Sequence, residues 1–163
     1  MTEAAARTDG VRWSSLEGGD LTLHLNNTID AVEQGRGPLA AFYGLHGLSP
    51  KVVNRIEVIF EELVSNVIRH GFEPASDQSI RVLATAEPDA IELLFEDDGA
   101  PFDPLAAAAP PKPESLQTAQ LGGLGIPLVI GLSTSVRYES ASDAKATPGF
   151  HPRNRLTIRV ARA

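Results

Sequence analysis

The stretch that most constrains the fold runs from Val58 to Phe72 and reads Val-Ile-Phe-Glu-Glu-Leu-Val-Ser-Asn-Val-Ile-Arg-His-Gly-Phe. Apolar residues recur in and just before it at spacings of three and four, which predicts one amphipathic helix packed against a core. The residues of this apolar stripe are Val52, Ile56, Ile59, Phe60, Leu63 and Val67. Gly71 should end the helix, because glycine tolerates the left-handed backbone that commonly stops one.

Three polar residues follow the flank of this stripe. Glu62, Asn66 and His70 are spaced by four, so in an α-helix they form one row at the border between core and solvent. A carboxylate and a carboxamide one turn apart can face a shared cleft. Exposed charge is the default on a helix surface, however, so this row alone favours a solvated face over a functional site.

Length and charge limit the classes of function. With 163 residues, 42% of them apolar and 21% charged, the chain suits one domain with one core. The net charge of −7 argues against a nucleic-acid surface. It fits a basic partner, or a nucleotide whose charge is met by metal and backbone amides. The sequence has no cysteine, no apolar signal core and no stretch of membrane-spanning length, so we expect a soluble cytoplasmic protein without a membrane partner.

The chain begins with a predicted tail and hairpin. Residues 1–12 are expected to be a flexible tail, and short strands are expected over 13–16 and 21–25. Leucines alternate with polar residues in the second strand, which predicts one buried and one polar face. His24 is therefore expected to be an exposed strand histidine.

A weaker helical pattern precedes the central helix. It covers about 27–46 and is interrupted by Gly35–Pro38, which predicts a kink or two separate pieces. Ser49 and Pro50 then form a clear start signal for the central helix, with the serine as cap and the proline in the first turn.

The second half of the chain predicts four strands and a lid. The strands are expected over 79–85, 90–96, 135–139 and 154–160. The segment from about 103 to 121 contains an Ala- and Pro-rich run without a hydrophobic period. Such a run inside a compact domain is typical of a mobile functional lid or a linker.

Two glycine-containing motifs flank that segment. Asp97-Asp98-Gly99 follows a strand, where a carboxylate can accept from an exocyclic amine and a glycine lets a flat ring approach the backbone. Asp and Gly also dominate ordinary turns, so alone this motif favours a turn. Gly122-Gly-Leu-Gly125 opens a helix, and its backbone N–H groups could cradle phosphate or form a hinge. It is neither a Walker loop nor a Rossmann fingerprint.

In sequence order these motifs are far more specific than they are singly. The chain resembles the GHKL ATPase superfamily, and within it the small anti-sigma-factor serine/threonine kinases. The resemblance lies in the order of its motifs: a helix with Glu-x-x-x-Asn, a strand that ends in Asp-x-Gly, a loop, and a helix that opens with Gly-Gly-x-Gly. The resemblance covers about residues 13–161. It rests on Glu62–Asn66 with Arg69–Gly71, Asp97–Gly99 with Pro101–Pro104, Gly122–Ile126, and the closing strands Arg137–Glu139 and Asn154–Ile158.

The resemblance implies a fold and a site. The fold would be a two-layer α/β sandwich of the Bergerat type, with a mixed, mostly antiparallel sheet packed against helices in one domain over 13–163. ATP and Mg²⁺ would be the cofactors. Glu62 would be the general base, Asn66 would coordinate Mg²⁺, and Asp97 would contact the adenine amine. The other nucleotide-binding residues would be His70, Gly99, Gly122, Gly123, Leu124, Gly125 and Thr157, with Thr157 beneath the adenine.

The implied function is a Mg-ATP-dependent protein serine/threonine kinase that acts as an anti-sigma factor. It would phosphorylate a serine of a small STAS-type antagonist protein. Sequestration of a sigma factor and a homodimeric state are further expectations from the resemblance. The alternative is a non-catalytic switch that binds a partner according to whether ATP or ADP is bound. Glu62 favours the kinase, because transfer to a serine hydroxyl gains from a carboxylate that takes its proton.

Overall fold

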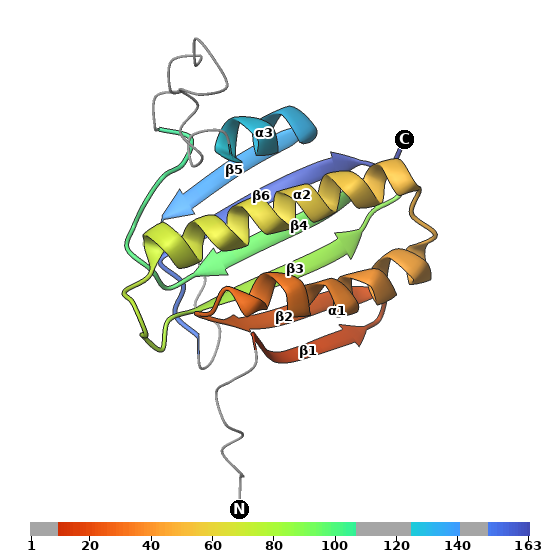
Figure 1. Ribbon diagram of the computed structural model, residues 1–163. Coiled ribbons are helices and arrows are strands. Elements are labelled where there is room, and N and C mark those ends of the chain that lie inside the picture. Colours follow the sequence, from red (N-terminus) through yellow and green to blue (C-terminus); the bar gives the residue numbers. More distant parts are fainter. Residues whose placement is uncertain (1–9, 107–124, 141–149) are drawn as a thin grey trace, which may run out of the picture.

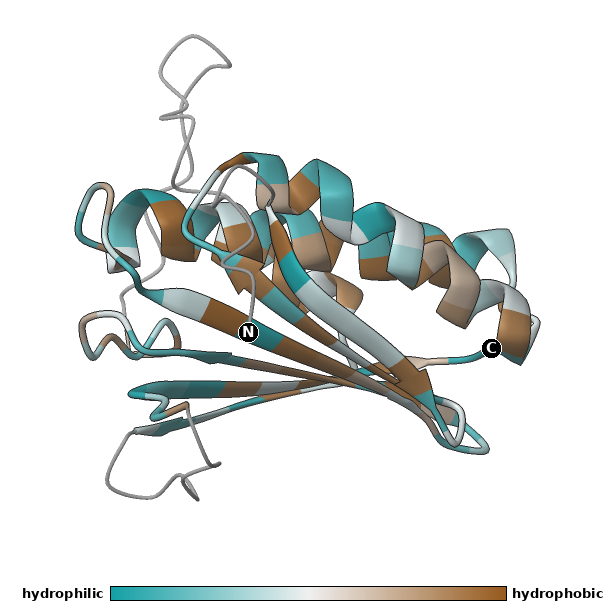
Figure 2. Ribbon diagram, turned by 90° about the horizontal axis from the view of Figure 1, so that it is seen from below, coloured by the Kyte–Doolittle hydropathy of each residue, from teal (hydrophilic) through white to brown (hydrophobic). Residues whose placement is uncertain are grey.

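One six-stranded sheet carries the fold, and the described helices lie on one of its faces (Figures 1 and 2). The computed structural model describes residues 10–106, 125–140 and 150–163. The strands are β1 (Val11–Glu17), β2 (Asp20–Asn26), β3 (Ser79–Ala86), β4 (Ala90–Asp97), β5 (Ser135–Ser140) and β6 (Asn154–Ala161). The helices are α1 (Asp30–His46), α2 (Pro50–Asn66) and α3 (Gly125–Leu132), and a π-helical turn η1 (Val67–Gly71) continues α2. The expected two-layer α/β sandwich is confirmed.

The strand order is β1-β2-β3-β4-β6-β5, and every pairing in the described sheet is antiparallel. The expected mixture with parallel pairs is therefore wrong. Strands β4 and β5, which precede and follow α3, do run parallel to each other. Strand β6 lies between them, however, and pairs antiparallel with both.

The central helix packs as its pattern predicts. Ser49 caps α2, since its side chain accepts a hydrogen bond from the Val52 N–H, and Pro50 occupies the first turn. The apolar stripe is buried against the sheet except for Val67, which is half-buried. The facing residues of the sheet include Leu23, Val82, Leu93 and Ile158. None of the helices in the described ranges combines the length and hydropathy of a bilayer-spanning helix.

The end of the central helix differs from the prediction. The α-helix stops at Asn66, and the chain continues as η1, in which the Phe72 N–H donates to the Val67 carbonyl at 3.1 Å. This wider i→i+5 turn takes His70 out of the α-helical row that Glu62 and Asn66 begin. Gly71 is also not left-handed, because the glycines with positive φ in the described chain are Gly18, Gly19 and Gly47.

His24 is buried, not exposed as expected, with 8% of its surface accessible. It lies on the sheet face opposite the helices, between the rings of Trp13 and Phe150 at centroid distances of 5.6 and 5.5 Å. Its Nε2 shares a hydrogen bond of 2.8 Å with Ser79 Oγ. Burial, together with the charges of two nearby arginines, lowers the pKa of His24 to about 4. The alternation within β2 could not predict this burial, because the Phe150 ring that covers His24 belongs to a distant part of the sequence.

The first strand and first helix also depart from expectation. Strand β1 begins at Val11, so Val11 and Arg12 belong to the sheet and not to the tail; residues 1–9 lie outside the described residues. Helix α1 is one element that includes Pro38, and not two pieces. The glycine before the proline has a packing reason: a Cβ on Gly35 would lie 2.6 Å from Cζ of the buried Phe60.

Gly35→Ala is expected to lower the free energy of unfolding by about 1–3 kcal/mol, because the added methyl overpacks the contact with Phe60. Urea denaturation measures this. The matched control is Gly44→Ala in the same helix, where an added Cβ meets no atom within 4 Å. The control should gain a few tenths of a kcal/mol from helix propensity. Equal stability changes in both variants would contradict the close approach.

Candidate functional site

Asp97, the last residue of β4, presents a buried carboxylate on the helix-covered side of the sheet. The residue is 8% exposed, and its strand partner is Asn154. Asp97 Oδ1 accepts two hydrogen bonds of 3.0 Å, from the Gly99 N–H and from Asn154 Nδ2. Within the described part of the chain Oδ2 accepts none, so the carboxylate keeps one acceptor for a ligand.

Burial raises the pKa of Asp97 to about 6, and the neighbouring Asp98 adds to the rise. The hydrogen bonds from Asn154 and Gly99 act in the opposite direction. A ligand that donates a hydrogen bond to Oδ2 would favour the ionised form further. A strongly perturbed carboxyl at a strand end is typical of a functional site.

Gly99 joins two motifs that are far apart in the sequence. A Cβ at this position would lie 2.5 Å from the Gly71 carbonyl oxygen, which also accepts a 3.0 Å hydrogen bond from the Ala100 N–H. The end of η1 therefore packs directly against the loop that follows Asp97. His70, next to this contact, is exposed.

Glu62, a residue of α2, lies beside the first residue of α3. A Cβ on Gly125 would be 2.7 Å from Glu62 Oε2, so a larger residue at this position would have to displace the end of the Glu62 side chain. A helix N-terminus carries partial positive charge, which favours a carboxylate or a phosphate beside it. The structure thus brings Glu62 and Gly125 together.

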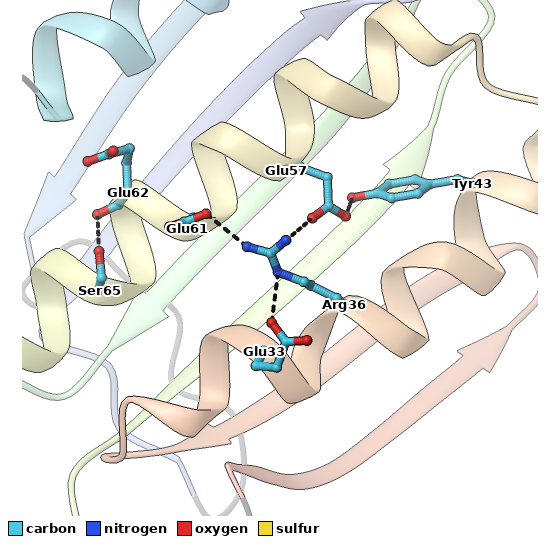
Figure 3. Close-up of polar contacts among 7 residues, drawn as sticks. All are labelled: Glu33, Arg36, Tyr43, Glu57, Glu61, Glu62 and Ser65. Atoms are coloured by element: carbon cyan, nitrogen blue, oxygen red, sulfur yellow. Dashed lines mark hydrogen bonds and ion pairs between the residues drawn. The ribbon is translucent and has the colours of Figure 1, made fainter.

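The neighbouring glutamate has a different role. Glu61 forms an ion pair of 2.8 Å with Arg36 of α1, which also approaches Glu33 and Glu57 (Figure 3). Figure 3 shows the Glu62 side chain pointing away from this cluster. In the described residues the Glu62 carboxylate takes part in no ion pair or hydrogen bond. Glu61 thus contributes to the contact between α1 and α2, whereas the Glu62 carboxylate lies apart from this ion-pair cluster (Figure 3).

Asn66 lies one turn after Glu62 and is half-buried. Its carboxamide oxygen is a hard ligand of the kind that Mg²⁺ accepts, and Mg²⁺ usually keeps waters and substrate phosphates as its other ligands. The described residues contain no group of three or more His, Cys, Asp or Glu side chains that could hold a metal by themselves. A metal delivered with phosphates and held by one protein oxygen fits this donor set.

Thr157 does not join the site. It pairs with Leu94, three residues from Asp97, so its side chain lies on the opposite face of the sheet. The expectation that it underlies the adenine is corrected. Gly122, Gly123 and Leu124, and positions 107–121 of the expected lid, lie outside the described residues.

Asn154 is a residue that the sequence interpretation missed. It starts β6, and its side chain contacts Asp97 directly. A signal was present, because Asn154 continues the alternation of Leu156, Ile158 and Val160 and therefore belongs to the buried face. A polar residue at the end of such a series indicates a buried polar contact.

Comparison with known proteins identifies relatives. The sequence profile of the histidine kinase-like ATPase domain matches residues 25–148. Serine/threonine-protein kinase BtrW of Bordetella bronchiseptica is 30% identical over 48% of this chain, and the match spans 56% of that protein. Serine-protein kinase RsbW of Listeria monocytogenes is 26% identical over 72% of this chain and 77% of its own length. Anti-sigma F factor of Priestia megaterium is 27% identical over 54% of this chain and 60% of its own.

Proposed function

We propose, because this chain belongs to the family of histidine kinase-like ATPase domains, that it is a Mg-ATP-dependent protein serine/threonine kinase acting as an anti-sigma factor. Its substrate would be a serine of a small STAS-type antagonist protein. The names of relatives support the direction of this proposal, since they include serine-protein kinases and an anti-sigma factor. The observation that carries its catalytic part is the half-buried Glu62 carboxylate against Gly125.

Three described side chains would have different roles in the proposed site. Asp97 would bind the adenine amine through Oδ2, Asn66 would hold Mg²⁺ on the phosphates, and Glu62 would accept the proton of the serine hydroxyl. When bound, Mg²⁺ neutralises phosphate charge. Transfer to serine depends mainly on positioning and charge stabilisation, and an aimed carboxylate helps by taking the hydroxyl proton.

Two observations support the proposed protein partners, namely the net charge of the chain and the names of the similar proteins. The net charge of −7 suits a basic partner surface. Sequestration of a sigma factor and homodimerisation belong to this proposal as well. ATP-dependent partner binding without phosphoryl transfer would instead support the non-catalytic switch.

Asn66→Ala is expected to weaken Mg-ATP binding by about tenfold or more, because it removes a ligand that bonds to a charged group. Calorimetric titration with ATP, with Mg²⁺ and with a chelator, measures this. Chelation should weaken binding to the wild type but change little in the variant. Ser65→Ala is the matched control on the same helix, since among the described residues the Ser65 hydroxyl donates to the Glu62 backbone carbonyl alone. A variant that keeps the full Mg²⁺ dependence would exclude Asn66 as the ligand.

A further inference from the structure

Asn154 is buried and uses every hydrogen-bonding group of its carboxamide. Nδ2 donates to Asp97 Oδ1 at 3.0 Å and to the Ala100 carbonyl at 2.9 Å. Oδ1 accepts from the Phe102 N–H at 2.9 Å and from the Tyr138 hydroxyl at 2.7 Å. A carboxamide has two donors and two lone pairs, so this set is complete. If the amide were flipped, Nδ2 would face the Phe102 N–H and Oδ1 would face the Asp97 carboxylate and the Ala100 carbonyl. These partners therefore determine the orientation of the amide.

The four bonds join three segments around the candidate site. They connect the end of β4, the loop over residues 100–102 and strand β5, all to the first residue of β6. The backbone adds a fifth link, because the Arg153 N–H donates to the Asp97 carbonyl at 2.7 Å. The position of the Asp97 carboxylate is thus set from β6.

We propose that Asn154 is a positioning residue that holds Asp97 Oδ1 and so leaves Oδ2 turned to the ligand. Tyr138 supports it by donating to the amide oxygen, which keeps Nδ2 directed at Asp97. The identity of the ligand as an adenine nucleotide rests on the proposed function. The control of the carboxylate by Asn154 does not.

This arrangement makes the ionisation of Asp97 a readout of the role of Asn154. The donated hydrogen bond favours the ionised carboxylate and opposes the effect of burial on its pKa. The other titratable groups that act here are Asp98, which raises the Asp97 pKa, and Tyr138, whose own pKa is raised by burial, Asp103 and Asp97. Removing the Asn154 donor should therefore raise the Asp97 pKa further.

The test uses Asn154→Leu, which keeps the size of the side chain and removes its hydrogen bonds. The carboxyl carbon of Asp97 is followed by NMR through a pH titration of the nucleotide-free protein, and ATP affinity is measured over the same pH range. The Asp97 midpoint should rise by about one unit, and ATP affinity at pH 7 should fall about tenfold. Loss of binding on acidification should shift to higher pH by the same amount.

Val160→Ala is the matched control, because Val160 is a fully buried residue at the other end of β6. It should lower stability and leave both the Asp97 midpoint and the ATP affinity unchanged. An Asp97 midpoint that does not move in folded Asn154→Leu, or that moves equally in Val160→Ala, overturns the inference.

Tyr138→Phe keeps the inference testable if Asn154→Leu does not fold. It removes only the hydroxyl that bonds Asn154 Oδ1, so the Asp97 midpoint should rise by a smaller amount in the same direction. An unchanged midpoint in that variant would then overturn the inference. If the midpoint moves as expected but the wild type binds no ATP, the proposed function fails and the positioning role of Asn154 stands.

Discussion

Glu62→Gln is expected to slow phosphoryl transfer to the serine of the antagonist by about 10²–10⁴-fold, the usual contribution of a general base. The amide keeps the size of the side chain and most of its hydrogen bonding, but it cannot take the hydroxyl proton. ATP affinity should stay nearly normal, because Asp97 and Asn66 are unchanged. Single-turnover transfer at saturating ATP measures the chemical step directly.

The matched control for this change is Glu61→Gln, one residue earlier on the same helix. Glu61 forms an ion pair with Arg36, and its side chain is largely exposed. Breaking an exposed ion pair of this kind costs about 1 kcal/mol or less, so the control should transfer phosphate at the wild-type rate. Wild-type transfer by Glu62→Gln would exclude Glu62 as the base.

Asp97→Asn is expected to reduce ATP affinity by about ten- to over a hundredfold, because it replaces a charged hydrogen bond to the ligand. The two bonds that Oδ1 accepts from Gly99 and Asn154 can persist in the amide, so the fold should survive. Calorimetric titration measures the affinity. Unchanged ATP binding by the folded variant would contradict the role of Asp97.

The same variant should be more stable than the wild type at neutral pH. Burial raises the Asp97 pKa from 3.8 to about 6, so the unfolded chain loses this proton first as the pH rises. The wild type therefore loses stability between about pH 4 and pH 6, by up to about 3 kcal/mol, and the amide does not. Urea denaturation should give the variant a higher free energy of unfolding than the wild type at pH 7 but not at pH 4. A pH-independent difference would contradict the raised pKa.

Much of the fold could be predicted because its signals are local. The Ser49-Pro50 start of α2, its apolar stripe and the alternating strands each depend on neighbours a few residues away. The spacing of Glu62 and Asn66 likewise placed both side chains on one side of α2 without reference to the sheet. The place of Asp97 at the end of a strand, before a glycine-containing turn, could also be predicted locally, whereas its proposed role came from the resemblance.

The missed features all depend on contacts between distant segments. Which residue of β6 faces Asp97 is decided by strand register, and a shift of three positions separates Asn154 from Thr157 and moves the side chain to the other face. The burial of His24 depends on Phe150, which packs on the open face of the sheet. The π-helical turn ends where the Gly71 carbonyl meets Gly99 and Ala100, and no spacing within α2 encodes that contact.

On the proposed function, this chain transfers the γ-phosphate of ATP to a serine of an antagonist protein. The most direct measurement incubates the wild-type chain with Mg-ATP and candidate STAS-type antagonists in a single turnover, and locates any phosphate by mass spectrometry. We expect stoichiometric phosphorylation of one antagonist serine, which disappears when Mg²⁺ is chelated. Tight Mg-ATP binding with no phosphoserine on any antagonist, and with partner binding that still depends on ATP, would contradict it.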